Sequence, residues 1–90
     1  MELSRVFWGV KKFSSWTNSP ARVLEVIDGS PAAISGVKAG DVIVAMDGKA
    51  VATPKDVMQL IGTKQPGDRL QANISRDGKT LDIESVLRVR

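Results

Sequence analysis

The residue types that most often carry out chemistry in proteins are either missing from this chain or scattered along it. The chain has no histidine and no cysteine, which excludes a Ser-His-Asp triad, a thiol nucleophile, a disulfide, and metal sites of imidazole or thiolate. Its acidic residues number 10, so a carboxylate-only acid–base or calcium site stays an alternative. Half of them stand beside glycine, which favours turn formation: Asp28, Asp41, Asp47, Asp68 and Asp77. We therefore expect a non-catalytic chain without metal or cofactor.

Length and charge limit the remaining classes of function. The 90 residues predict a single domain, placed at 1–90 with a folded core at about 6–89. A nucleic-acid surface needs a dense basic stripe with interleaved aromatic residues, whereas this chain has a net charge of only +3 and no tyrosine. No nucleic-acid partner is expected, although a small basic β-domain that binds nucleic acid remains an alternative.

Membrane segments are also not expected in this domain. No apolar stretch approaches the ~18–20 residues that are needed to span a bilayer. The first residues, Met1-Glu2-Leu3, lack the basic start of a signal peptide, and we interpret the chain as an excised domain or a mature fragment.

The segment 29–48 predicts a turn, a short helix, a second turn, a strand and a third turn. Pro31 suits the first turn of a helix because it has no N–H to lose, and Gly36 can end that helix in the left-handed conformation. Residues 42–46 form an apolar run typical of a buried strand, and Asp47-Gly48 supplies turn chemistry.

A second helix is predicted over residues 54–63. Thr53 is a favourable N-cap, Pro54 occupies the first helical position, and Asp56 stands where an acid supports the cap. The helix carries two apolar stripes and must therefore contact two partners. We expect Val57 and Leu60 to face the core, and a second stripe to border another surface: Pro54, Met58 and Ile61.

Strands surround these helices. Residues 6–10 are apolar around one glycine, residues 11–14 continue in extended form, and a strand is expected at 21–27, all before the first helix. Residues 70–74 alternate as a half-buried strand does, and residues 81–84 alternate again in a strand that runs on to 89. Between the last two, Asp77-Gly78 predicts a two-residue hairpin of type I′.

This order of elements resembles a PDZ domain over residues 6–89, in the bacterial form attached to Deg-type serine proteases and site-2 metalloproteases. The resemblance rests on Gly-Ser-Pro-Ala at 29–32, Gly40-Asp41 before an aliphatic strand, the helix at 54–63, and Pro-Gly-Asp at 66–68. It implies an α+β fold, a partly open β-barrel or sandwich of five to six strands with two helices.

The resemblance also implies a site for peptides. Phe7-Trp8-Gly9-Val10 is similar to a carboxylate-binding loop, although Trp8 is bulkier than the usual aliphatic residue. An extended peptide would pair with the sheet edge at 10–14, beside the helix at 54–63. The expected peptide-binding residues are Phe7, Trp8, Gly9, Val10, Lys11, Lys12, Phe13, Pro54, Met58 and Ile61. Core packing is the alternative for the apolar side chains, and plain solvation is the alternative for the two lysines.

The function implied is recognition of a peptide C-terminus or an extended segment, as a tethering or regulatory part of a larger bacterial protease. The resemblance places such a protease outside the cytoplasm, in the periplasm or tethered to a membrane. One alternative is a structural module that docks on its parent protease chain or on another subunit and has no free peptide ligand.

Overall fold

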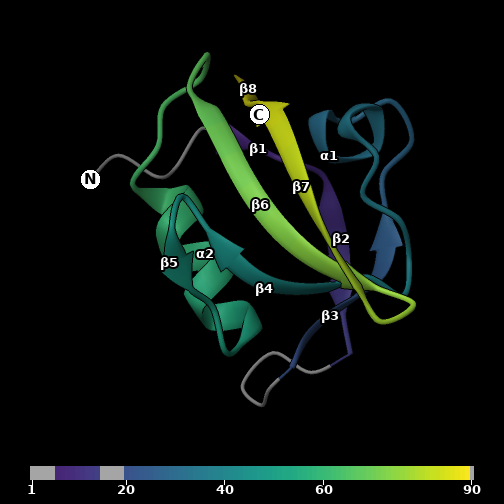
Figure 1. Cartoon of the computed structure of the whole chain (residues 1–90). Helices are drawn as coiled ribbons and strands as arrows, with labels where there is room; N and C mark the ends of the chain where they lie inside the picture. The colour runs from purple at the N-terminus through teal and green to yellow at the C-terminus, as the bar shows by residue number, and fades with distance from the viewer. Residues whose placement is uncertain (1–5, 15–19, 90) are drawn as a thin grey trace.

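The computed structural model describes residues 6–14 and 20–89 of the chain. A six-stranded antiparallel sheet consists of β2 (Val10–Phe13), β3 (Ala21–Val26), β4 (Val42–Met46), β5 (Lys49–Ala50), β6 (Arg69–Arg76) and β7 (Lys79–Val86). Its order is β2-β3-β4-β6-β7, and β5 pairs with β4 (Figure 1). Two further short strands, β1 (Val6–Phe7) and β8 (Arg88–Val89), pair with each other. Together with two helices, this confirms the expected α+β fold, whereas the β1–β8 pair was not predicted.

The first helix, α1 (Pro31–Ser35), begins and ends where the sequence predicts. The Ser30 hydroxyl accepts a hydrogen bond from the Ala33 N–H at 3.1 Å, which satisfies one of the helix's free donors. At the other end, Gly36 adopts a φ of 109°, in the region that favours glycine.

The second helix, α2 (Pro54–Gly62), begins with a complete capping box. The Asp56 N–H donates to the Thr53 hydroxyl at 3.4 Å, and the Thr53 N–H donates to the Asp56 carboxylate at 3.2 Å. Because both ends of this reciprocal pair lie within four residues, the start of α2 is fixed by local sequence.

Two tight turns have the backbone conformation that their sequences predict. Asp47 and Gly48 have φ values of 51° and 80°, and Asp77 and Gly78 have values of 52° and 78°. Positive φ at both central positions matches the right-handed twist of the flanking strands. The second turn sets the register of β6 against β7, where Arg76 pairs with Lys79.

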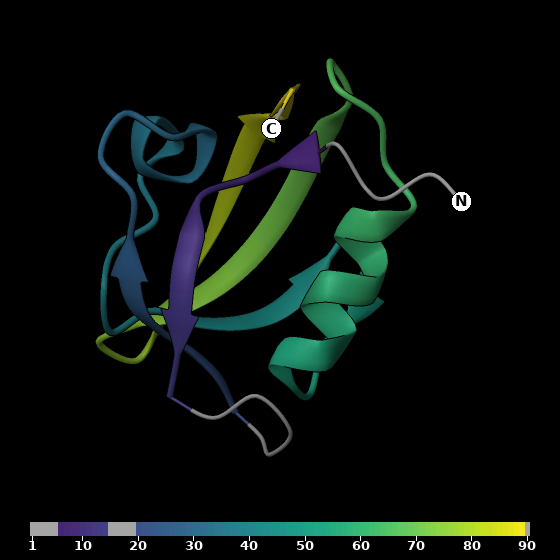
Figure 2. The same ribbon diagram turned by 180° about the vertical axis from the view of Figure 1, so that it is seen from behind.

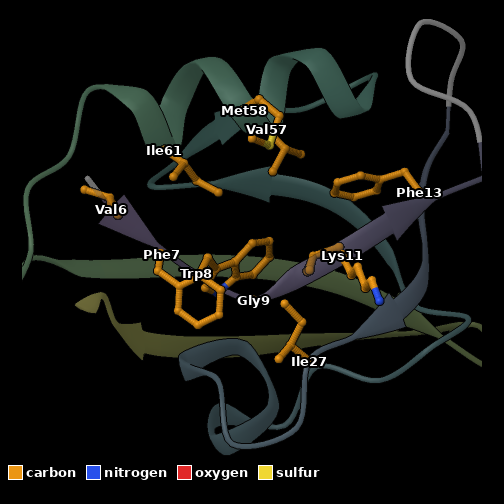
Figure 3. Close-up of a pocket in the computed structure, with 11 residues that line it drawn as sticks. Val6, Phe7, Trp8, Gly9, Lys11, Phe13, Ile27, Val57, Met58 and Ile61 are labelled. Atoms are coloured by element: carbon orange, nitrogen blue, oxygen red, sulfur yellow. The ribbon is translucent and has the colours of Figure 1, made fainter. Parts of the chain in front are cut away.

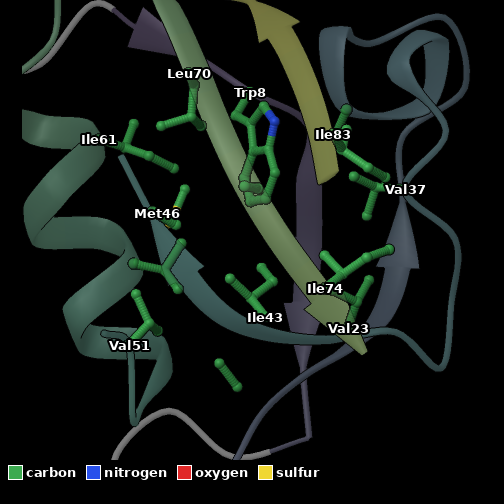
Figure 4. Packing of buried hydrophobic residues seen from close by; sticks show 14 of the residues in the cluster. Trp8, Val23, Val37, Ile43, Met46, Val51, Ile61, Leu70, Ile74 and Ile83 are labelled. Carbon is green, nitrogen blue, oxygen red and sulfur yellow. The ribbon is translucent and has the colours of Figure 1, made fainter. Parts of the chain in front are cut away.

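Apolar side chains from the sheet and from both helices meet in one core (Figure 4). The largest fully buried apolar residues include Ile43, Met46, Leu70, Ile74 and Leu87. These come from β4, from β6 and from the segment after β7, so the core depends on the central strands being neighbours.

The strand β2 lies at one edge of the sheet, and α2 runs alongside it with β4 and β6 behind (Figure 2). Within residues 6–14 and 20–89, neither helix reaches the length and apolar character that crossing a bilayer requires. The arrangement leaves one side of β2 facing α2, which is where the candidate site lies.

Candidate functional site

A pocket of ≈ 280 Å³ lies between α2 and the segment that runs from β1 into β2 (Figure 3). Its lining is mainly apolar and comes from three parts of the chain: Val6, Phe7, Trp8, Gly9, Val10, Lys11 and Phe13 from the first segment, Ile27 after β3, and Val57, Met58 and Ile61 from α2. The chain's own described side chains therefore leave this space open.

The backbone beside the pocket is turned so that it can donate hydrogen bonds. The Trp8 carbonyl accepts from the Ala32 N–H at 2.7 Å, and the Gly9 carbonyl accepts from the Ile27 N–H at 2.8 Å. In a planar trans peptide group, the next residue's N–H points opposite to the carbonyl. The N–H groups of Gly9 and Val10 are therefore directed away from α1 and β3, towards the side bordered by α2.

Gly9 is fitted closely to the first helix. It has a φ of +118°, and a Cβ built on it would overlap the Oγ and Cβ atoms of Ser30, the N-cap of α1. Only glycine allows the loop to approach the helix this closely with this backbone conformation.

On α2, the side chains that border the pocket differ from the predicted stripe. Val57 and Ile61 are both buried in the core and line the pocket, and Met58 lines it with 47% of its surface exposed. Pro54 is fully buried and lies outside the lining, and Leu60 is only partly buried against the core. The two predicted stripes are not separate, because α2 packs with one broad face across both the sheet and the pocket.

The two lysines of β2 share one acidic partner on β3. The Nζ atoms of Lys11 and Lys12 lie 3.6 and 4.0 Å from the carboxylate oxygens of Glu25. All three side chains are about half exposed, so these ion pairs contribute little to stability. Lys11 lines the pocket, whereas Lys12 does not.

The three aromatic residues of the first segment have different environments. Trp8 and Phe13 are buried, with 3% and 4% exposed, and contribute to the core as well as to the pocket. Phe7 is half-buried, and the Arg88 guanidinium lies 5.9 Å from the centroid of its ring. Core packing and pocket lining were alternatives for Trp8, and the structure shows that Trp8 does both.

Sequence reasoning missed three lining residues: Val6, Ile27 and Val57. Val57 was assigned to the core alone, although its place one turn before Ile61 puts both on one face of α2. Ile27 follows β3 and comes near the loop through its hydrogen bond to Gly9, and no sequence signal marks that contact.

No group of three metal-ligating side chains is found in the part of the chain that the structure describes. Among the carboxylates, burial alone would raise the pKa of Asp41, but hydrogen bonds from Arg76 and the Lys38 N–H outweigh it and lower that pKa. The pKa of Asp47 is lowered in the same way, because burial is outweighed by Lys64 and the Gln71 N–H. These groups are ionised partners in structural contacts, and the pocket itself offers hydrogen-bond donors and apolar surface rather than acid–base chemistry.

Comparison with known proteins agrees with this geometry. The family model described as PDZ domain matches residues 10–87. The periplasmic pH-dependent serine endoprotease DegQ of Escherichia coli is 36% identical over 77 residues, and the match covers 86% of this chain and 17% of DegQ. A putative zinc metalloprotease of Brucella suis is 36% identical over 61 residues, covering 68% of this chain and 16% of that protein. The chain thus spans about a sixth of the length of these relatives.

Two solved structures share the fold at 22% sequence identity. The HtrA-type protease AlgW with a decapeptide has a TM-score of 0.83, covering 96% of this chain and 30% of the AlgW chain. The HtrA3 PDZ domain bound to the phage-derived ligand FGRWV has a TM-score of 0.76, covering 94% and 86%. The chain therefore belongs to the PDZ domain family and is related to DegQ- and DegP-type serine endoproteases and to site-2 type zinc metalloproteases.

Proposed function

We propose that this domain binds the C-terminal end of an extended peptide, which adds as a strand to the open edge of β2. The observation that carries this proposal is the orientation of the Gly9 and Val10 N–H groups towards the α2 side. Successive backbone N–H groups in such a loop form a site for an anion, and a terminal carboxylate is the anion that an extended peptide brings.

The apolar pocket gives the terminal side chain a place to bind. Val57 and Ile61 supply fixed walls because they are also core residues, and exposed Met58 supplies a flexible one. A thioether side chain adapts to ligands of different shape, so Met58 is the residue that we assign to selectivity. Lys11 borders the pocket and would lie near the part of the peptide that precedes its terminal residue. Lys12 and Pro54 lie outside the pocket lining, and we assign them a supporting role.

The relatives support this proposal and suggest a wider role. AlgW and the HtrA3 PDZ domain were both solved with peptides, and DegQ is a periplasmic endoprotease. We propose that the domain tethers substrates to, or regulates, an extracytoplasmic protease chain of which it is one part. With no histidine or cysteine in the 90 residues, the proteolytic chemistry of that chain would lie elsewhere.

The free carboxylate provides the sharpest test. The pentapeptide FGRWV would be titrated by calorimetry as the free acid and as the C-terminal amide. Hydrogen bonds to a charged group contribute about 1.5–3 kcal/mol, so the amide should bind about ten- to a hundredfold more weakly. A peptide of the same composition in scrambled order controls for binding through apolar surface alone.

Each other outcome would identify an alternative. Equal affinity for acid and amide would contradict carboxylate capture and favour recognition of internal segments. No binding to a C-terminal peptide library, together with binding to the parent protease, would favour the docking module. Binding to DNA or RNA that weakens steeply with added salt would favour the nucleic-acid alternative.

A further inference from the structure

The Trp8 side chain is tied into the protein by a buried hydrogen bond. Its indole Nε1–H donates to the Ser85 hydroxyl of β7 at 3.0 Å, across 77 residues of sequence. Both residues are almost fully buried, at 3% and 2% exposed. An indole N–H can only donate, so in this contact the Ser85 oxygen is the acceptor.

The Ser85 hydroxyl is in turn 2.6 Å from the hydroxyl of Ser35, at the end of α1. The Ser35 hydroxyl also donates to the Ala32 carbonyl at 3.0 Å. Each hydroxyl has one proton, and Ser35 uses its proton on Ala32, so the proton between the two serines comes from Ser85. This direction gives every proton an acceptor and runs from Trp8 through Ser85 and Ser35 to Ala32.

The chain of hydrogen bonds then returns to its starting residue. The Ala32 N–H donates to the Trp8 carbonyl at 2.7 Å. Trp8 is thus linked to α1 twice, through its side chain by way of Ser85 of β7 and Ser35, and directly through its backbone carbonyl. Along the part of this path that passes through the two hydroxyl groups, consecutive hydrogen bonds polarise and strengthen one another.

We propose that Ser85 and Ser35 are positioning residues of the pocket between α2 and the segment that runs from β1 into β2. They act on this pocket by holding Trp8. Trp8 lines the pocket, so the place of its indole sets the shape of the pocket. The Trp8 carbonyl also fixes the direction of the Gly9 N–H. The two serines do not line the pocket and would act on a ligand only by holding Trp8 in place. This inference rests on the proposed function, because it assumes that the pocket takes a peptide's terminal residue.

The first test needs no ligand. Hydrogen exchange of the Trp8 indole N–H would be followed by NMR, with its signal identified by its loss in Trp8→Phe. Exchange should be slow in the wild type and at least about tenfold faster in Ser85→Ala, since a net hydrogen bond of ~1.4 kcal/mol corresponds to tenfold. Ser35→Ala should also speed exchange, although its hydroxyl does not touch the indole, because Ser85 loses its acceptor.

The matched control is Ser75→Ala, the same chemical change at a half-buried serine on neighbouring β6. It should leave the indole exchange as in the wild type. Unchanged exchange in both Ser85→Ala and Ser35→Ala would overturn the proposal. If the Ser85→Ala variant does not fold, Ser35→Ala still tests the same ring of hydrogen bonds, at a residue that is only half-buried.

The second test measures how the serines affect the pocket's selectivity for the terminal residue of a peptide. The ratio of affinities for FGRWV and for the same peptide ending in alanine should shift about three- to tenfold in Ser85→Ala. In a Trp8→Phe background, Ser85→Ala and Ser35→Ala should no longer shift this ratio, because the indole donor is gone. A shift that persists without the indole would show that the serines do not act through Trp8. If the wild type binds neither peptide, the proposed function fails, while the exchange experiment still decides whether the ring holds Trp8.

Discussion

Arg76, the last residue of β6, binds the carboxylate of Asp41 through two nitrogen atoms of its guanidinium group. The Nε atom donates to Oδ1 at 2.8 Å and Nη2 donates to Oδ2 at 2.7 Å. Nη2 also donates to the Gly36 carbonyl at 2.7 Å, and the Lys38 N–H donates to Asp41 at 2.8 Å. Asp41 is 1% exposed, so the segment between α1 and β4 is fastened to the hairpin of β6 and β7 through a buried charge.

Arg76→Ala should destabilise the fold by an amount between the losses typical of exposed and of fully buried ion pairs. The reason is that a buried carboxylate loses its countercharge, while Arg76 itself keeps 29% of its side chain exposed. Urea unfolding at neutral pH would measure the loss. Arg69→Ala, at the exposed start of the same strand, is the control and should change stability by less than about 0.5 kcal/mol. Equal losses in the two variants would contradict a structural role for the ion pair.

Acid should unfold the protein partly through Asp41. Its pKa is lower in the folded state than the ordinary value of 3.8, so the ionised form favours folding. That stability is fully present above pH 3.8 and is lost as the pH falls through the folded pKa. Free energies of unfolding measured from pH 7 down to pH 2 should therefore be flat at first and then fall. Asp41→Asn should be less stable at pH 7 and show a shallower fall. An unaltered acid limb in that variant would assign the fall to other groups, with Asp47 the next candidate.

Gly9→Ala should damage the fold as well as ligand binding. The structure places a Cβ added at this position against the Oγ and Cβ atoms of Ser30, the N-cap of α1. Gly40→Ala is a suitable control, since Gly40 has a φ of +95° and nothing within 4 Å of its added Cβ. Backbone strain costs about 1–2 kcal/mol in either variant. Only Gly9→Ala adds the overlap with Ser30, so it should lower the melting temperature clearly more than Gly40→Ala. Equal melting temperatures would mean that α1 shifts to make room.

Substitutions along α2 should separate stability from selectivity. Val57→Ala and Ile61→Ala remove buried side chains and should lower stability more than Leu60→Ala, with losses of up to about 2–5 kcal/mol for the isoleucine. Met58→Ala should cost little stability and should change the preference for the terminal residue of the peptide. Thermal melts and peptide titrations on the four variants would measure both effects. If Met58→Ala proves the most destabilising and leaves selectivity intact, the assigned orientation of α2 is wrong.

The sequence by itself determined the local structure. The capping box of Thr53 and Asp56, the left-handed Gly36 at the end of α1, and the turn at Asp77-Gly78 all appear where the residues predict them. These features depend on backbone preferences and on hydrogen bonds between residues at most four positions apart. The loop at Phe7–Val10 and the edge strand after it were also located, through the family resemblance.

Only the tertiary structure decided which distant residues meet. Asp41 and Arg76 are 35 positions apart, Trp8 and Ser85 are 77 apart, and β1 pairs with β8 across nearly the whole chain. Which side of α2 faces the pocket also depended on how the helix packs on the sheet, so the pairing of Val57 with Leu60 was only partly right. No short stretch of sequence carries such information, because these contacts arise from strand order and from the burial of side chains contributed by all the elements together.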